Sequence, residues 1–341
     1  MPVRVVLDAM GGDHAPANEV IGAIQALKTL GGDVELILVG REEELQPLLA
    51  NKEVTSGCRI VHAPDVVGMG DEPSSIIKHR QQSSLYVGLA LMRDGQADAF
   101  VSGGNTGAVM ATATMLCGRL PGVSRPTIGS FFPTKTGRPC LLVDVGANVD
   151  SKPKFLGDYA VMGSVYCKQM MGVDDPSVGL LNVGEEEGKG TEVAKETYDL
   201  LRTKPIRFIG NVEGRDVLAG TVDVIVCDGF EGNIVLKFAE SVLGFLKAKL
   251  RAYADRGLVQ KLLIGAFAPV LKSALKDMDY QEYGGVPLLG INGVVIIGHG
   301  SSSPVAISNM IVRAVEVVRK DVNGHIKAAL AAPSTSQTEH A

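Results

Sequence analysis

Two Gly-flanked loops carry side chains that suit the attack of an anion on a carbonyl group. Lys189 lies in "GEEEGKGT" and offers a mobile positive charge. Asn233 lies in "CDGFEGN", where we expect a helix to start, and its neutral amide can donate hydrogen bonds but cannot act as a base. Inorganic phosphate is anionic near neutral pH and can itself supply the nucleophile. The protein would then align it with an electrophilic carbonyl and stabilise the oxyanion, which predicts catalytic roles for Lys189 and Asn233.

Each candidate also has an ordinary structural interpretation. Lys189 alone is compatible with a solvated loop charge, and Asn233 alone with a helix N-cap. His14 and His299 follow strands and could shuttle protons, but hydrogen-bonded structural histidines are equally consistent with the pattern. Cys227 is a weak candidate for a nucleophile, because the end of an apolar strand raises the pKa of a thiol.

Familiar cofactor and nucleophile motifs are not met. "SGGNTG" begins with Ser where the dinucleotide fingerprint has Gly. "GEEEGKGT" has three residues between Gly184 and Gly188 where a P-loop has four, and Gly190 stands where Ser or Thr should follow the lysine. No nucleophile elbow, H-E-x-x-H pair or calcium loop is found in the sequence. We therefore expect no metal, no cofactor and no covalent acyl-enzyme.

Short apolar runs alternate with helical segments and define the expected fold. The runs are "VRVVLDA", "VELILVG", "ADAFVSG", "CLLVDVG", "VGLLNVG", "IRFIGNV", "VDVIVCDG" and "GVVIIGHG". Helical periodicity lies between many of them, in residues 72–93, 152–170, 191–202 and 303–320. This alternation predicts an α/β fold: a Rossmann-like, doubly wound, mainly parallel sheet with helices on both faces.

Six of these runs end in loops that combine Gly with Asn, Asp, Ser or Thr. Gly alone often serves only a tight turn, but ligands of open α/β sheets bind at the carboxyl ends of strands, and helix starts there bind anions. Six such loops, which we place on one edge of the sheet, favour a cleft for phosphate. The candidate substrate- and phosphate-binding residues are Gly11, Gly12, Asp13, His14, Gly103, Gly104, Asn105, Thr106, Asp144, Asn148, Asp228, Gly232, His299 and Ser301.

The composition describes an ordinary globular protein. The chain has 341 residues, 45% of them hydrophobic, and no Pro/Ser-rich linker, so we expect one domain over 1–331 with a helical excursion near 245–280 and a loose tail over 332–341. A net charge of −5 argues against a nucleic-acid partner. Five cysteines without a C-x-x-C pair, and no apolar leader, indicate a reducing cytoplasm. The uncharged stretch 284–312 contains "GHGSSSP" and is interpreted as strand, turn and helix.

The helical excursion combines positive charge with an apolar stripe. Between residues 247 and 276 one acid, Asp255, accompanies seven basic residues: Lys247, Lys249, Arg251, Arg256, Lys261, Lys272 and Lys276. Such a surface suits an acidic protein or an anionic membrane, although a merely solvated helix face fits equally well. The segment 257–271 is too short to span a bilayer. We expect it to lie on the membrane surface through Leu258, Leu262, Leu263 and Phe267, the alternative being a core or dimer-interface helix.

Together, these motifs resemble one family, the bacterial phosphate acyltransferases of phospholipid synthesis. The matching stretches cover nearly the whole chain from Val3 to about Lys320: "VLDAMGGDHAP", "DEP", "SGGNTGA", "LLVDVGANVDSKP", "YAVMGSVY", "VGLLNVGEEEGKG", "FIGNVEGRD", "CDGFEGNIVLK" and "YGGVPLLG". The resemblance implies transfer of a fatty acyl group from acyl carrier protein to orthophosphate. The product, acyl phosphate, would serve a membrane-embedded glycerol 3-phosphate acyltransferase.

The resemblance also implies a homodimer in the cytoplasm that associates peripherally with the inner face of the cell membrane, and catalytic importance for Lys189 and Asn233. Two other functions stay open from the residues themselves. One is a short-chain phosphate acyltransferase that uses acyl-coenzyme A, and the other is a non-catalytic phosphate-sensing partner of a membrane acyltransferase.

Overall fold

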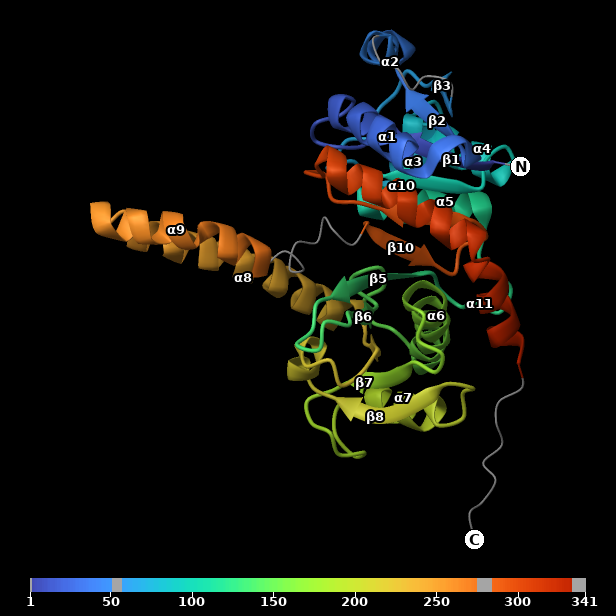
Figure 1. The fold of residues 1–341 in the computed structure, drawn as a ribbon. Coiled ribbons are helices and arrows are strands. Elements are labelled where there is room, and N and C mark those ends of the chain that lie inside the picture. Colours follow the sequence, from blue (N-terminus) through green and yellow to red (C-terminus); the bar gives the residue numbers. More distant parts are fainter. Residues whose placement is uncertain (1, 51–56, 275–283, 333–341) are drawn as a thin grey trace.

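The computed structural model describes residues 2–50, 57–274 and 284–332, and its described residues form one 11-stranded sheet (Figure 1). The strand order is β3-β2-β1-β4-β11-β10-β5-β6-β9-β7-β8. The strands are β1 Val3–Asp8, β2 Val34–Gly40, β3 Cys58–His62, β4 Ala99–Ser102, β5 Thr127–Phe132, β6 Cys140–Val143, β7 Ser177–Leu181, β8 Arg207–Val212, β9 Val224–Val226, β10 Val286–Leu289 and β11 Val294–Ile297. Most strand pairs are parallel, so the predicted fold class is confirmed.

Helices cover both faces of this sheet. They are α1 Ala17–Leu30, α2 Glu42–Leu49, α3 Pro73–His79, α4 Ser84–Arg93, α5 Thr106–Cys117, α6 Pro153–Met171, α7 Glu192–Leu201, α8 Gly229–Ala254, α9 Leu258–Ala274, α10 Pro304–Arg319 and α11 Val322–Ala331. The helix expected over 72–93 is two helices. Ser83 separates them because its side chain accepts a hydrogen bond from the Tyr86 N–H and caps α4.

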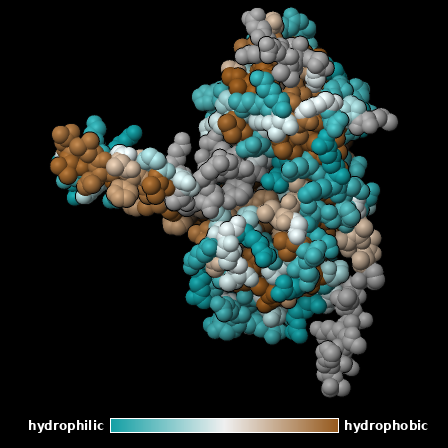
Figure 2. Space-filling model, in the orientation of Figure 1, coloured by the Kyte–Doolittle hydropathy of each residue, from teal (hydrophilic) through white to brown (hydrophobic). Residues whose placement is uncertain are grey.

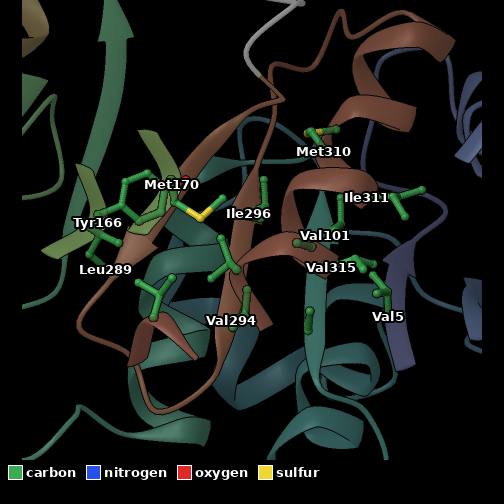
Figure 3. Close-up of a cluster of buried hydrophobic side chains, with 14 of the residues drawn as sticks. Val5, Val101, Tyr166, Met170, Leu289, Val294, Ile296, Met310, Ile311 and Val315 are labelled. Carbon is green, nitrogen blue, oxygen red and sulfur yellow. The ribbon is translucent and has the colours of Figure 1, made fainter. Parts of the chain in front are cut away.

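Alternate residues of the central strands enter two apolar clusters, one on each face. Val5 and Leu7 of β1 pack with α1 and α10, while Val6 packs with α4 and α5 on the other side. Figure 3 shows part of the first cluster, with Val5, Val101 and Val315 lying together and Tyr166 and Met170 further along the sheet. Burial on both faces explains why these strands are continuously apolar.

The sheet consists of two parallel blocks that run in opposite directions. β10 is antiparallel to both β11 and β5, and β5 is antiparallel to β6. The strands of the block β3-β2-β1-β4-β11 therefore run antiparallel to the strands of the block β6-β9-β7-β8. The expectation that all six Gly-rich loops share one sheet edge is wrong, because three of them follow strands of each block.

The register of β10 nevertheless brings the two sets of loops together. Its first residue, Val286, lies opposite Ile297, the last residue of β11. Two positions later Leu288 lies opposite Ile128, whose carbonyl accepts a hydrogen bond from the Val145 N–H just after β6. The carboxyl ends of two oppositely directed strands thus meet near the middle of the sheet.

The predicted helical excursion forms an arm that extends from the body of the molecule (Figure 1). It begins earlier than expected, because α8 runs without interruption from Gly229 to Ala254 before α9 packs back along it. Its predicted end, residues 275–280, and the tail from residue 333 lie outside the described residues. No helix in the described ranges is long and apolar enough to cross a membrane.

Candidate active site

The loops after β1, β4 and β11 form one wall of the candidate site. Asp8, buried at the end of β1, accepts a hydrogen bond from the Ser102 hydroxyl at 2.8 Å, and that hydroxyl accepts one from the Gly104 N–H at 3.0 Å. The Asp13 N–H donates to the Gly300 carbonyl at 2.8 Å. Neither Asp8 nor Ser102 was predicted from sequence, and both fix the backbone of the Gly-rich turns.

Asn105 joins this wall to the segment before α3. Its side-chain oxygen accepts from the Ala108 N–H at 3.0 Å and caps α5, while its amide donates to the Met69 and Asp71 carbonyls. The polar atoms of the Asn105 side chain therefore have hydrogen-bond partners within the protein. Its neighbour Thr106 is exposed at the first position of α5, where backbone N–H groups suit an anion.

The loop after β6 forms the opposite wall and is organised by a buried carboxylate. Asp144 accepts hydrogen bonds from the N–H groups of Gly146, Ala147 and Asn148 at 2.8–3.0 Å. The Asn148 amide donates to Asp144 and to the Pro126 carbonyl, so both of its donors are used. Burial raises the pKa of Asp144, and the three N–H donors oppose that rise. Asp144 and Asn148 therefore shape this loop.

Two glycines three residues apart press the start of α8 against the same loop. A Cβ at Gly229 would overlap the Asn148 carbonyl oxygen, and a Cβ at Gly232 would overlap the Asp144 carbonyl oxygen and lie 2.9 Å from the Cys227 sulfur. Only a residue without a side chain permits this approach. The spacing in "GFEGN" thus produces helix-to-loop contact.

Asn233 is held at the mouth of this contact. A Cβ at Gly146, whose φ is +124°, would lie 3.3 Å from both Cβ and Oδ1 of Asn233. Asn233 is the fifth residue of α8, and Asp228 is the N-cap, with its Oδ1 accepting from the Phe230 N–H. The interpretation of Asn233 as the helix start is therefore wrong, and its amide makes no hydrogen bond within the part of the chain that the structure describes.

One cavity of about 310 Å³ lies between the two walls. From the first block it is lined by Thr106 of α5 and His299 after β11, and from the second by Gly146 and Asn233. Polar and apolar groups complete it: Gly107, Met110, Ile128, Ser130, Phe131, Val145, Leu236, Lys237, Glu240, Gly285, Val286, Ile297 and Gly298. Three predicted site residues from distant parts of the chain are thus brought together.

Lys189 lies outside this cavity, on the loop between β7 and α7. The loop is closed by Asn182, whose amide donates to the Lys189 carbonyl at 3.1 Å, and by Asn211, which donates to the Glu186 carbonyl. Gly190 has a φ of +89°, and a Cβ on it would overlap the Asn182 side chain. Lys189 is exposed and pairs with no acid among the described residues. Because β7 neighbours β9, this loop lies next to the start of α8.

The remaining predicted residues are backbone positions or exposed side chains of the first wall. His299 accepts from the Ser301 N–H through Nδ1, which also lies 2.8 Å from the Ser301 hydroxyl. His14 is exposed beside α1. Buried or close-packed glycines form the turns themselves, namely Gly11, Gly12, Gly103 and Gly104.

Cys227 is unsuited to nucleophilic attack. Its side chain is buried, and its Sγ donates to the Asp144 carbonyl at 3.3 Å. Burial raises the pKa of this thiol well above its ordinary value, and nearby Asp144 adds to the effect. The thiol therefore stays protonated and packs the junction of β9 and α8.

Two acids near the site have pKa values shifted in opposite directions. Burial raises the pKa of Glu19 to about 7, and the charges of Asp8 and Asp13 add to that rise. Burial also disfavours ionised Asp228, but the N–H groups of Phe230 and Ser151 outweigh it and hold that pKa below its usual value. Asp228 is thus an ionised cap of α8, near the Lys189 loop.

Comparison with known proteins identifies the family. The family model described as "Fatty acid synthesis protein" matches residues 3–325. The phosphate acyltransferase of Chlorobaculum parvum is 46% identical over 337 residues, which cover 96% of this chain and 99% of that protein. This chain belongs to the phosphate acyltransferase family. The family member from Dictyoglomus thermophilum is 43% identical and covers 95% of this chain and 96% of its own. The protein is therefore an acyltransferase that acts on phosphate and an acyl substrate.

Solved structures with the same fold are more distant. The EutD phosphotransacetylase of Staphylococcus aureus has a TM-score of 0.61 at 19% identity, and covers 93% of this chain and 94% of its own. A phosphotransacetylase from Streptococcus pyogenes has a TM-score of 0.63 at 18% identity with the same coverage. These likenesses show a shared α/β fold.

The four residues expected to contact a membrane are exposed on the arm. Leu258, Leu262, Leu263 and Phe267 are between 47% and 74% exposed, so they do not belong to the core of this chain. Figure 2 shows apolar residues gathered at the outer end of the arm. Lys276 lies outside the described residues; the basic residues with described side chains are all exposed, namely Lys247, Lys249, Arg251, Arg256 and Lys261.

Proposed function

We propose that this phosphate acyltransferase transfers a long-chain acyl group from acyl carrier protein to orthophosphate. A phosphate oxygen attacks the thioester carbonyl carbon, the carbon–sulfur bond breaks, and the carrier-protein thiolate leaves. The product is an acyl phosphate that a membrane-embedded acyltransferase uses to acylate glycerol 3-phosphate. The observation that carries this proposal is the cavity between the two walls, where Thr106, Asn233 and His299 converge beside apolar surface.

We assign each polar group near the cavity a separate role in this reaction. The start of α5 at Thr106 offers N–H groups and a positive helix end to phosphate. The Asn233 amide, which is free of other partners among the described residues, donates to the carbonyl oxygen as it becomes an oxyanion. Lys189, on the neighbouring loop, supplies positive charge when its long side chain turns toward the cavity. No acyl-enzyme is formed, which agrees with the buried, protonated Cys227.

The arm supports the choice of carrier protein as the acyl donor. Its exposed basic residues suit an acidic partner, and they belong to the helix pair whose first helix, α8, carries Asn233 in its second turn. A carrier protein docked there would present its thioester toward the cavity. We also propose that two arms in a homodimer hold the enzyme reversibly on an anionic membrane at the cytoplasmic face.

A short-chain transfer from acyl-coenzyme A is the second candidate, because the fold is shared with phosphotransacetylases. A direct assay separates the two. Purified protein is mixed with orthophosphate and either palmitoyl-type acyl carrier protein or acetyl-coenzyme A, and acyl phosphate is trapped with hydroxylamine. We expect product from the carrier-protein thioester in the presence of a chelator. Product from acetyl-coenzyme A alone would establish the second candidate, and no product with either would favour a phosphate-sensing role.

The membrane contact gives a separate prediction. Leu263→Glu combined with Phe267→Glu should abolish flotation with anionic liposomes while turnover and oligomeric state in the absence of membranes are unchanged, since both side chains face solvent. Leu263→Met with Phe267→Leu is the matched control and should still float. Aggregation or a change of oligomeric state in the Glu variant would place this surface in a protein interface.

A further inference from the structure

A second, larger cavity of about 480 Å³ opens beside the candidate active site. It is an apolar groove between α8 on one side and β5 and the 3₁₀ turn Gly214–Leu218 on the other. Its apolar walls include Phe132, Val217, Val235, Ala239 and Leu243. Three polar side chains, Ser130, Glu240 and Lys247, line this groove, and the rest of its lining is apolar side chains and glycine.

The two cavities adjoin each other along β5 and α8. Ser130 and Phe131 of β5 and Leu236 and Glu240 of α8 line both of them. The groove continues along α8 to Gly244 and Lys247. From Asn233 to Gly244 the helix advances about 16 Å at 1.5 Å per residue. A ligand with a polar reacting end at Asn233 and a long apolar tail therefore fits both cavities at once.

We propose that this groove binds the hydrocarbon chain of the acyl substrate, and that Gly244 sets how long a chain it accepts. The proposal rests on the function proposed above and adds the place of the acyl tail. Apolar burial in the groove would draw the chain from water and align the thioester carbon with phosphate. A methylene held there in place of water strengthens binding by about fourfold, which gives long chains their advantage.

Gly244 lines the far end of the groove and adds no side chain there. A Cβ built on it meets no atom within 4 Å. Beyond it, Lys247 is the only further residue of α8 that lines the groove in the described structure, and its charged head suits the exit to solvent. A larger side chain at position 244 fills this space without displacing backbone, and it raises the helix propensity of an exposed position.

The test compares chain lengths in one protein and its variants. In Gly244→Leu, kcat/KM for a C16 acyl donor should fall at least about tenfold relative to that for a C8 donor. Gly265→Leu is the matched control, because Gly265 of α9 also has open space at its Cβ and does not line the groove. That control should keep the wild-type ratio. An equal loss for both donors, or an unchanged ratio, would overturn the assignment.

Crosslinking and light scattering test the path of the acyl chain and the oligomeric state separately. A C16 donor with a terminal diazirine should crosslink to the peptide containing residues 242–247 in the wild-type enzyme, and labelling elsewhere would refute the path. If Gly244→Leu changes the oligomeric state measured by light scattering, the groove faces a second copy of the chain and the proposal fails. Absence of acyl phosphate from every donor with wild-type enzyme would instead reject the proposed function itself.

Discussion

Gly232→Ala tests whether the contact between α8 and the β6 loop places Asn233. The new Cβ would overlap the Asp144 carbonyl oxygen, which is backbone and cannot rotate away. Ordinary van der Waals contact begins near 3.4 Å, so the start of α8 has to move by more than about 1 Å. Asn233 is the next residue and moves with it, away from Gly146.

The substitution is expected to lower both turnover and stability. A misplacement of about 1 Å reduces turnover by on the order of a hundredfold when a group must meet a developing charge. The overlap itself should lower the free energy of unfolding by about 1–3 kcal/mol. Acyl phosphate formation under saturating substrate measures the first quantity, and urea unfolding followed by circular dichroism measures the second.

The matched control is Gly265→Ala, a change of the same size in the open space of α9. It should leave turnover unchanged and the stability equal or slightly higher. Wild-type turnover in Gly232→Ala would refute the reasoning, because it would show that the geometry of this contact does not set the position of the reacting groups. Loss of the fold at 25 °C would also contradict the expected size of the effect.

Three further predictions concern individual side chains. Lys189→Ala and Asn233→Ala should each reduce turnover about a hundredfold or more with unchanged circular dichroism, since both side chains are exposed; a loss below tenfold would remove them from the mechanism. Cys227→Ser should keep most activity, and an acyl group found on Cys227 by mass spectrometry would contradict direct attack. The pKa of Glu19 rises from 4.5 to about 7 on folding, so its stabilising contribution is complete below pH 4.5 and is lost as the pH rises through 7. Glu19→Gln should abolish this loss, which amounts to about 2.5 kcal/mol between pH 5 and pH 8 in urea unfolding; parallel curves would refute the shift.

The fold class could be predicted from sequence because its central strands are buried on both faces. Runs such as "VRVVLDA" are mostly apolar, and eight such runs are strands in the structure. Three strands were missed. β10 is four residues long and contains Pro287, β5 is interrupted by Gly129 and Ser130, and β3 lies at the sheet edge with alternating exposure. β10 and β5 create the antiparallel seam, so missing them produced the wrong picture of a single loop edge.

Individual residues of the candidate site could be predicted from their type and their place next to a Gly-rich turn. Which of them meet at one cavity could not be predicted, because the register of distant strands decides it. Asn233 and Thr106 stand out as polar residues next to Gly-rich turns, but only the pairing of β10 brings them to one cavity. Asp144 and Asn148 were interpreted as phosphate-binding residues from the same pattern. Their hydrogen bonds to the loop backbone show a shaping role that no local signal distinguishes from ligand binding.

Helix α8 connects the candidate active site, the apolar groove and the basic arm in one continuous helix. Its first turns place Asn233 against the β6 loop, its middle lines the apolar groove, and its last turns carry exposed basic residues of the arm. At 26 residues it spans about 39 Å without a proline or a described break. A force on the arm is therefore transmitted to the helix start, and the close contacts of Gly229 and Gly232 with backbone oppose its movement. The glycines at one end and the charges at the other thus serve the same requirement, which is to hold an acyl donor in a fixed position relative to the phosphate it must meet.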